Sequence, residues 1–135
     1  MIAAVRLNGA HAPCLFDGAM DGEMFLAWVK EGLAPVLASG DIVVLDNLAT
    51  HQVAGVEEAL VAVGARVEYL PPCSPDFNPV ENLWRKMKQI LKSCSPRTRR
   101  QLYTAAGAAF AAITSADCQG FFLNAVIATL FMEAL

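Results

Sequence analysis

The sequence predicts one α/β domain, and three observations carry that prediction. Asn8-Gly9, a strong hairpin turn signal, stands between two β-compatible stretches near the N-terminus. The run from Ile42 to Leu45 is continuously apolar and is bounded by acids, which is typical of a strand buried on both faces. After this run, apolar residues recur at helical spacing in several segments. With 135 residues, of which 56% are hydrophobic, the chain has ample apolar material for one core.

The first part of the chain predicts a hairpin and then a helix. Met1 to Leu7 is the first strand, and His11 to Phe16 returns as its partner. Asp21 is a good helix cap, and apolar residues at helical spacing extend the predicted helix to about Ala34, before Pro35 disturbs it.

The middle of the chain predicts a strand, a helix and a second strand. The buried strand runs from Asp41 to Asp46, and a helix from His51 to Val63 stops at Gly64. Arg66 to Leu70 has the composition of a further strand. Because four prolines fall between Pro71 and Pro79, neither a helix nor a central strand can run through that segment, and we expect an ordered loop.

Three helices are expected after this loop, at about 81–92, 98–113 and 115–129. Phe121 to Leu135 is apolar but only 15 residues long and contains Glu133, which is too short to cross a membrane as a helix. The four cysteines are widely spaced, which indicates neither a zinc site nor a disulfide framework and favours a reduced cytosolic setting.

The most informative feature is a pair of acids, Asp46 at the end of the buried strand and Glu81 at the start of the helix beyond the proline loop. Ligands of α/β sheets bind at such strand ends. Two-metal cleavage of a phosphodiester needs several carboxylates that converge on two divalent cations. Taken singly, each residue has an ordinary structural explanation. Asp46 is typical of a turn, Glu81 of a helix first turn favoured by the helix dipole, and a lone His51 of a structural histidine. Only the combination predicts a site.

The charge distribution is uneven. The formal net charge is −3, so a protein that grips nucleic acid with its whole surface is not expected. Seven of the ten basic residues nevertheless fall between positions 85 and 100, where no acid occurs. At about 100° per residue, Arg85, Lys88 and Lys92 share the helix face of Glu81. This face is either an ordinary solvated one or a surface for phosphates. The predicted DNA-binding residues are Arg85, Lys88, Lys92, Arg97, Arg99 and Arg100.

Three segments resemble DDE transposases of the insertion sequence 630 and mariner superfamily. They are Val44-Leu-Asp-Asn47, His51, and the run from Leu70 through Pro-Pro-Cys-Ser-Pro-Asp-Phe-Asn-Pro-Val-Glu-Asn-Leu to Trp84. Between Asp46 and Glu81 lie 34 residues, a common spacing of the second and third catalytic acids in that family. The resemblance implies an RNase H-like fold: a mixed sheet flanked by helices.

It also implies Mg²⁺ or Mn²⁺ as cofactor, metal-dependent DNA cleavage and strand transfer, and DNA as partner. Asp46 and Glu81 are then the catalytic and metal-binding acids, with Asn47, His51, Asn78 and Asn82 beside the site. The expected location is the bacterial cytosol, associated with the nucleoid. The organisation implied is a partial catalytic domain over 1–135, with the hairpin in 1–20, the acid-bearing core in 21–92 and helices in 93–135.

The sequence departs from the family pattern at its start. The family's first acid lies on a central first strand, upstream of the position that matches Met1, and Asp17 and Asp21 follow the hairpin instead. We therefore expect a fold without that strand, unpaired strand edges, and a two-metal site only if a first Asp is supplied. The isolated chain is expected to be an inactive fragment.

Two alternatives stay open at this point. One is a non-catalytic interaction module that self-associates or binds and inhibits full-length transposase. The other is a nucleotide-binding protein, which the absence of a Gly-x-x-x-x-Gly-Lys-Ser/Thr loop disfavours.

Overall fold

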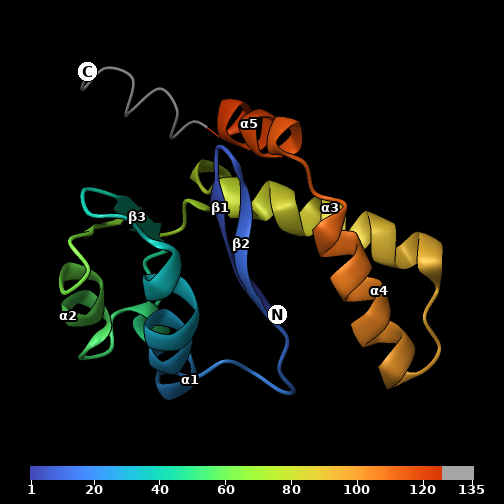
Figure 1. Cartoon of the computed structure of the whole chain (residues 1–135), viewed down its shortest axis with the longest axis horizontal. Helices are drawn as coiled ribbons and strands as arrows, with labels where there is room; N and C mark the ends of the chain where they lie inside the picture. The colour runs from blue at the N-terminus through green and yellow to red at the C-terminus, as the bar shows by residue number, and fades with distance from the viewer. Residues whose placement is uncertain (126–135) are drawn as a thin grey trace.

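The protein is described here from a computed structural model, which places residues 1–125 (Figure 1). Its strands are β1 (Ile2–Arg6), β2 (Gly9–Cys14), β3 (Ile42–Leu45) and β4 (Arg66–Tyr69). Its α-helices are α1 (Gly22–Trp28), α2 (Val56–Val61), α3 (Pro79–Cys94), α4 (Arg99–Ala111) and α5 (Ser115–Asn124). The α/β class predicted from the sequence is confirmed, and short sheets flanked by helices are consistent with an RNase H-like fold.

The four strands form two separate two-stranded sheets instead of one mixed sheet. β1 and β2 pair antiparallel, with Arg6 opposite Gly9, so the turn is Leu7-Asn8 and lies one residue earlier than predicted. β3 and β4 pair parallel, from Ile42 opposite Arg66 to Leu45 opposite Tyr69, with α2 as the crossover between them. Within residues 1–125, no strand pairs with the free edge of β1 or of β3.

Glycine and proline account for two corrections to the predicted helices. The helix expected from His51 to Val63 is a single 3₁₀ turn, Ala49–His51, followed by α2. Gly55 separates them because it adopts φ 95°, which a helix interior does not allow. α1 passes into a π-helical turn, Val29–Leu33, and then a 3₁₀ turn that contains Pro35, which cannot donate a backbone hydrogen bond.

Side-chain caps fix the starts of the remaining helices. Asp21 accepts a hydrogen bond from the Met24 N–H at 2.8 Å, which confirms it as a cap. Thr98 and Thr114 begin α4 and α5 through reciprocal capping boxes with Gln101 and Asp117. α5 ends at Asn124, and the part of the predicted helix beyond residue 125 lies outside the described residues.

The buried side chains form two main clusters. The first joins α1, β3 and α2 around Phe25, Leu45 and Leu60. The second joins the hairpin to α3, α4 and α5 around Leu83 and Met87. In Figure 1 the hairpin accordingly lies between the β3 side of the molecule and the three C-terminal helices. Among the described helices, none is both long and apolar enough to cross a membrane.

Candidate metal and nucleic-acid site

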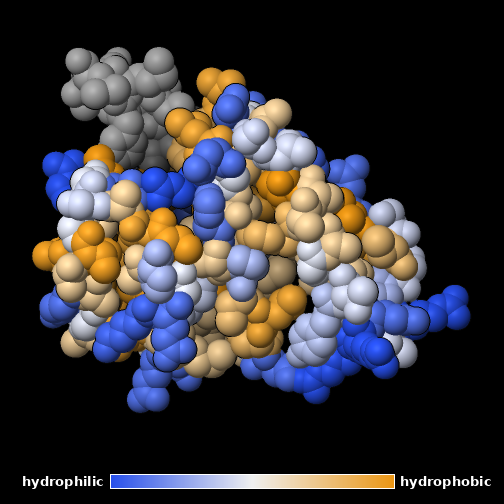
Figure 2. All heavy atoms as spheres, viewed as in Figure 1, coloured by the Kyte–Doolittle hydropathy of each residue, from blue (hydrophilic) through white to orange (hydrophobic). Residues whose placement is uncertain are grey.

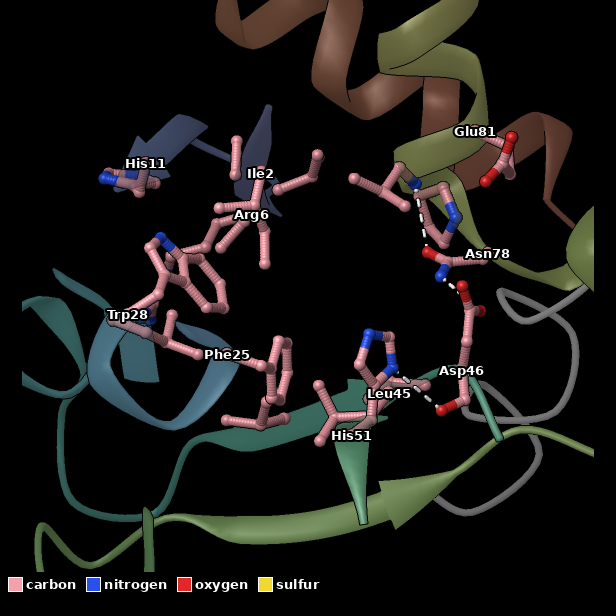
Figure 3. Close-up of a pocket in the computed structure, with 18 of the residues that line it drawn as sticks. Ile2, Arg6, His11, Phe25, Trp28, Leu45, Asp46, His51, Asn78 and Glu81 are labelled. Atoms are coloured by element: carbon pink, nitrogen blue, oxygen red, sulfur yellow. Dashed lines mark hydrogen bonds between the residues drawn. The ribbon is translucent and has the colours of Figure 1, made fainter. Parts of the chain in front are cut away.

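Asp46 follows β3 directly, and two neighbours hold it in place (Figure 3). The Asn78 amide Nδ2 donates a hydrogen bond to the Asp46 carboxylate Oδ1 at 2.6 Å. The His51 ring Nδ1 lies 3.0 Å from the Asp46 backbone carbonyl oxygen. Because that oxygen can only accept, Nδ1 carries the proton in this contact. Both the carboxylate and the backbone of Asp46 are therefore oriented.

Asn78 links Asp46 to α3. While its amide nitrogen donates to Asp46, its Oδ1 accepts the Val80 N–H at 3.1 Å and so caps the helix. Pro79 occupies the first helical position, where a missing N–H costs nothing. Glu81 lies in the same first turn, and its N–H donates to the Asn78 carbonyl at 3.1 Å. One residue thus connects the strand end that bears Asp46 to the helix turn that bears Glu81.

His51 is fixed from two sides. Its ring stacks on Phe25, with centroids 4.2 Å apart and 25° between the ring planes. At the ring edge, Nδ1 bonds a polar partner, the backbone carbonyl of Asp46. A stacked and hydrogen-bonded imidazole has little rotational freedom, so His51 serves as a rigid support for the end of β3.

Asp46, Glu81, His51 and Asn78 all line one cavity of about 530 Å³. Figure 3 shows this cavity between the hairpin, α1, β3 and the start of α3, with mostly apolar side chains around it. At another position on its wall, the Arg6 guanidinium donates to both Asp41 carboxylate oxygens, at 2.6 and 2.9 Å. This hydrogen bonding lowers the pKa of Asp41 below its ordinary value, and a hydrogen bond from the Ala38 N–H adds to the effect.

Two residues predicted to lie beside the site point elsewhere. Asn47 is exposed and accepts a hydrogen bond from the Gln52 side chain. Asn82 directs its amide toward the Phe121 carbonyl in α5, at 3.4 Å, while its oxygen accepts from Arg85. Neither lines the cavity. Sequence proximity to an acid did not reveal these directions, because neighbouring side chains differ by about 100° on a helix, as for Asn82, and point to opposite sides of an extended chain, as for Asn47 after β3.

Sequence reasoning missed Arg6 and Trp28 as cavity residues. The Trp28 indole N–H donates to the Ala12 carbonyl at 2.8 Å and ties α1 to the hairpin. An arginine inside an otherwise apolar strand was a usable signal, since such a charge needs a partner when half-buried. The partner, Asp41, was not readable from the sequence because it lies 35 positions away.

The predicted DNA-binding residues fall into two groups. Arg85, Lys88 and Lys92 are exposed along α3. Arg97, Arg99 and Arg100 are exposed near the start of α4, over which hydrophilic atoms gather at the lower right of Figure 2. Arg99 is engaged in an ion pair with Asp17 and lies over the Tyr103 ring, 5.8 Å from its centroid. Its charge is therefore partly neutralised.

Lys86 differs from its basic neighbours on α3. Its Nζ lies 2.6 Å from the Asp117 carboxylate of α5. The Lys86 contact, together with the hydrogen bond from the Thr114 N–H, lowers the pKa of Asp117 to about 2. The pair fastens α5 to α3, so Lys86 has a structural role and is not free to contact phosphate.

The acids fit a divalent metal in part. Carboxylate oxygens are the donors that Mg²⁺ and Mn²⁺ prefer. Over residues 1–125, however, no group of three or more histidine, cysteine, aspartate or glutamate side chains converges as a metal site. Asp46 and Glu81 both line the cavity, but neither belongs to such a cluster within the described chain.

A comparison with protein families gives a match that covers most of the chain, including both acids. The family model described as DDE superfamily endonuclease matches residues 1–103, which include the hairpin, Asp46, the proline loop and all of α3. The chain belongs to the DDE superfamily endonuclease family. A comparison with curated proteins found no match. DDE endonucleases are RNase H-like, in agreement with the fold, and membership supports a nuclease or transposase-type function in general.

Proposed function

We propose that this DDE endonuclease domain takes part in DNA transposition, with Asp46 and Glu81 as metal ligands for phosphodiester cleavage and strand transfer. The observation that carries the proposal is Asn78, which holds the Asp46 carboxylate against the helix turn that bears Glu81, at the wall of one cavity. If Asp46 only closed a turn, its carboxylate would not need the side-chain amide of Asn78 as a partner. An acid whose carboxylate must keep a fixed direction does need such a partner.

Each residue has a distinct part in this proposal. Asp46 and Glu81 would hold Mg²⁺ or Mn²⁺, while Asn78 and His51 orient Asp46 through its side chain and its backbone. When bound, the metal would stabilise the negative charge that develops on phosphate oxygens. The exposed Arg85, Lys88 and Lys92 continue from Glu81 along α3, where they would bind the DNA backbone.

Two carboxylates are fewer than a two-metal site needs. We therefore expect the purified chain to bind a divalent cation weakly and to cleave DNA poorly or not at all. A further acid would complete the site.

Isothermal titration calorimetry with Mg²⁺ and with Mn²⁺ tests the metal pair. Asp46→Asn and Glu81→Gln should each abolish the binding heat of the unmodified chain, because each removes one anionic ligand. Asn at position 46 can still accept the Asn78 hydrogen bond, so the fold is preserved. Asp76→Asn and Glu57→Gln, both exposed and outside the cavity lining, are the matched controls and should bind normally. Absence of binding in the unmodified chain, or binding that survives both site variants, would overturn the proposal.

A further inference from the structure

One acidic side chain of the loop between β2 and α1 reaches across to α4. The Tyr103 hydroxyl donates a hydrogen bond to Asp17 Oδ1 at 3.1 Å. Arg99 forms an ion pair with the other carboxylate oxygen of Asp17, Oδ2. The Arg99 Nε–H also donates to the Tyr103 hydroxyl oxygen, at 3.2 Å. Two residues of one helix thus hold a single carboxylate by both of its oxygens.

The Arg99–Tyr103 pair is an arrangement of donors that suits an anion. The two residues are four positions apart, so they share one face of α4. The guanidinium can only donate, and the hydroxyl donates its proton to the anion while it accepts from Arg99. Arginine binds two oxygens of a phosphate in the same way as two oxygens of a carboxylate. A phosphate group can therefore take the place that the Asp17 carboxylate occupies.

The contact between Asp17 and Arg99 is open to solvent, unlike the other ion pair of this basic stretch. The Arg99 and Asp17 side chains are 64% and 66% exposed, against 35% and 23% for Lys86 and Asp117. An exposed ion pair contributes little to stability. Asp17 also lies outside the helices and strands and is followed by Gly18. The carboxylate can therefore leave Arg99 at little cost to the fold.

The surroundings of this pair favour an extended anion. Arg97 and Arg100 lie beside Arg99 in the sequence and are exposed, and within residues 1–125 neither takes part in an ion pair. Both line a shallow hollow at the start of α4. A single small anion would leave these two arginines unused. The backbone of a nucleic acid presents a phosphate at every nucleotide, so it can engage several neighbouring arginines at once.

We propose that Arg99 and Tyr103 form a binding site for a phosphate of the DNA backbone, and that Asp17 occupies this site until DNA displaces it. This role rests on the DNA binding proposed above and adds a competing acid from the chain itself. Asp17 does not line the cavity that Asp46 and Glu81 share. It thus lowers the affinity for DNA without contact with the metal ligands.

Fluorescence anisotropy with a labelled DNA duplex in about 0.1 M KCl tests the competition. Asp17→Asn should raise the affinity about two- to fivefold, the range that corresponds to an exposed ion pair, because asparagine has the same shape but no charge to hold Arg99. Glu57→Gln is the matched control. It removes one exposed negative charge from α2, on the far side of the molecule from α4 (Figure 1), and should leave the affinity nearly unchanged. Equal gains in both variants would overturn the proposal, since net charge alone would explain them.

Two further variants locate the effect. In the Arg99→Gln background, Asp17→Asn should bring no gain in DNA affinity, because no guanidinium is left to release. A gain that persists there would be contrary to the proposal. In the Asp17→Asn background, Tyr103→Phe should weaken DNA binding about twofold or more, since the hydroxyl no longer donates to phosphate. Unchanged affinity would show that Arg99 acts without Tyr103, and the two-donor site would be wrong.

The double variant Arg85→Gln/Lys88→Gln separates this competition from the proposed function. If it weakens DNA binding while Asp17→Asn has no effect, the DNA-binding role of α3 stands and only the competition by Asp17 is wrong. If neither the parent chain nor the Asp17→Asn variant binds the duplex even at low salt, both proposals for DNA fail together.

Discussion

Asn78 makes two hydrogen bonds whose consequences can be measured separately. One caps α3, and the other holds Asp46. Asn78→Ala should lower the free energy of unfolding by about 1 kcal/mol through loss of the cap. Asn78→Ser keeps a capping oxygen but is too short to reach Asp46, so its stability should stay closer to that of the parent chain.

If Asn78 positions Asp46 for a metal, both variants should weaken Mn²⁺ binding, although only the alanine variant is clearly destabilised. Urea denaturation and calorimetry on the same samples give the two quantities. Normal Mn²⁺ affinity in the serine variant would show that the amide serves the helix alone.

The Lys86–Asp117 pair gives the protein a specific acid dependence. Because the folded chain lowers the pKa of Asp117 from 3.8 to about 2, its contribution to stability is complete above about pH 4. It decreases as the pH falls from there toward 2, where the carboxylate is protonated. Asp117→Asn keeps an oxygen for the Thr114 N–H but removes the charge. Its unfolding free energy should therefore change less steeply than that of the parent between pH 4 and 2, as measured by urea denaturation at each pH. Parallel pH profiles would contradict this assignment.

At the scale of the element, α3 joins an acid-bearing first turn to a basic exposed face. If this face binds DNA phosphates, each lysine or arginine adds about 0.9 to the slope of log affinity against log salt concentration. The double variant Arg85→Gln/Lys88→Gln should thus reduce the slope for duplex DNA by about 1.8. Lys30→Gln/Arg66→Gln removes the same charge from α1 and β4 regions and is the matched control. Anisotropy titrations over a range of KCl concentrations measure the slopes. If the two double variants reduce the slope equally, the change reflects net charge alone, and the exposed face of α3 is not the DNA-binding surface.

Elements with a strong local signal were predictable from the sequence. The apolar run of β3, the prolines before α3 and the amphipathic spacing of α3 each determine structure over a few residues. The late start of α2 was not predicted, because the apolar spacing from Val53 onward is helical and only the positive φ of Gly55 interrupts it. The π-helical turn after α1 depends on packing around Trp28 and on Pro35, which periodicity does not encode.

The same distinction holds for the candidate site. Asp46 and Glu81 were predictable because strand ends and helix starts are visible in the sequence. Their connection through Asn78 and the support from the His51–Phe25 stack were not, since both depend on contacts between distant segments. The division of the sheet follows from the same limit: the sequence contains four strand signals, but only tertiary placement decides which edges meet.

At the scale of the whole molecule, the two hydrophobic clusters are joined by few polar contacts. Trp28 bonds Ala12, Arg6 bonds Asp41, and Asn78 bonds Asp46. Some hairpin side chains, such as Ile2 and Ala4, also pack against the first cluster. No backbone ladder between β1 and β3 reinforces these contacts within the described residues, and the cavity lies in its place. A small third cluster around Leu70, which includes Val44 and Phe122, also joins the two halves. Because the halves share no backbone ladder within the described residues, we expect the cohesion between them to be weaker than the cohesion within either.

This weak coupling predicts unfolding that is not two-state. In the Trp84→Phe variant the remaining tryptophan, Trp28, reports on the first cluster, while the far-ultraviolet circular dichroism signal comes mainly from α3, α4 and α5 around the second. Coincidence of two such probes is the usual sign of a single cooperative transition. Because no sheet joins the halves, we expect the fluorescence and dichroism midpoints in urea to differ. Superimposable curves would show that the polar contacts and the apolar packing already couple the clusters fully.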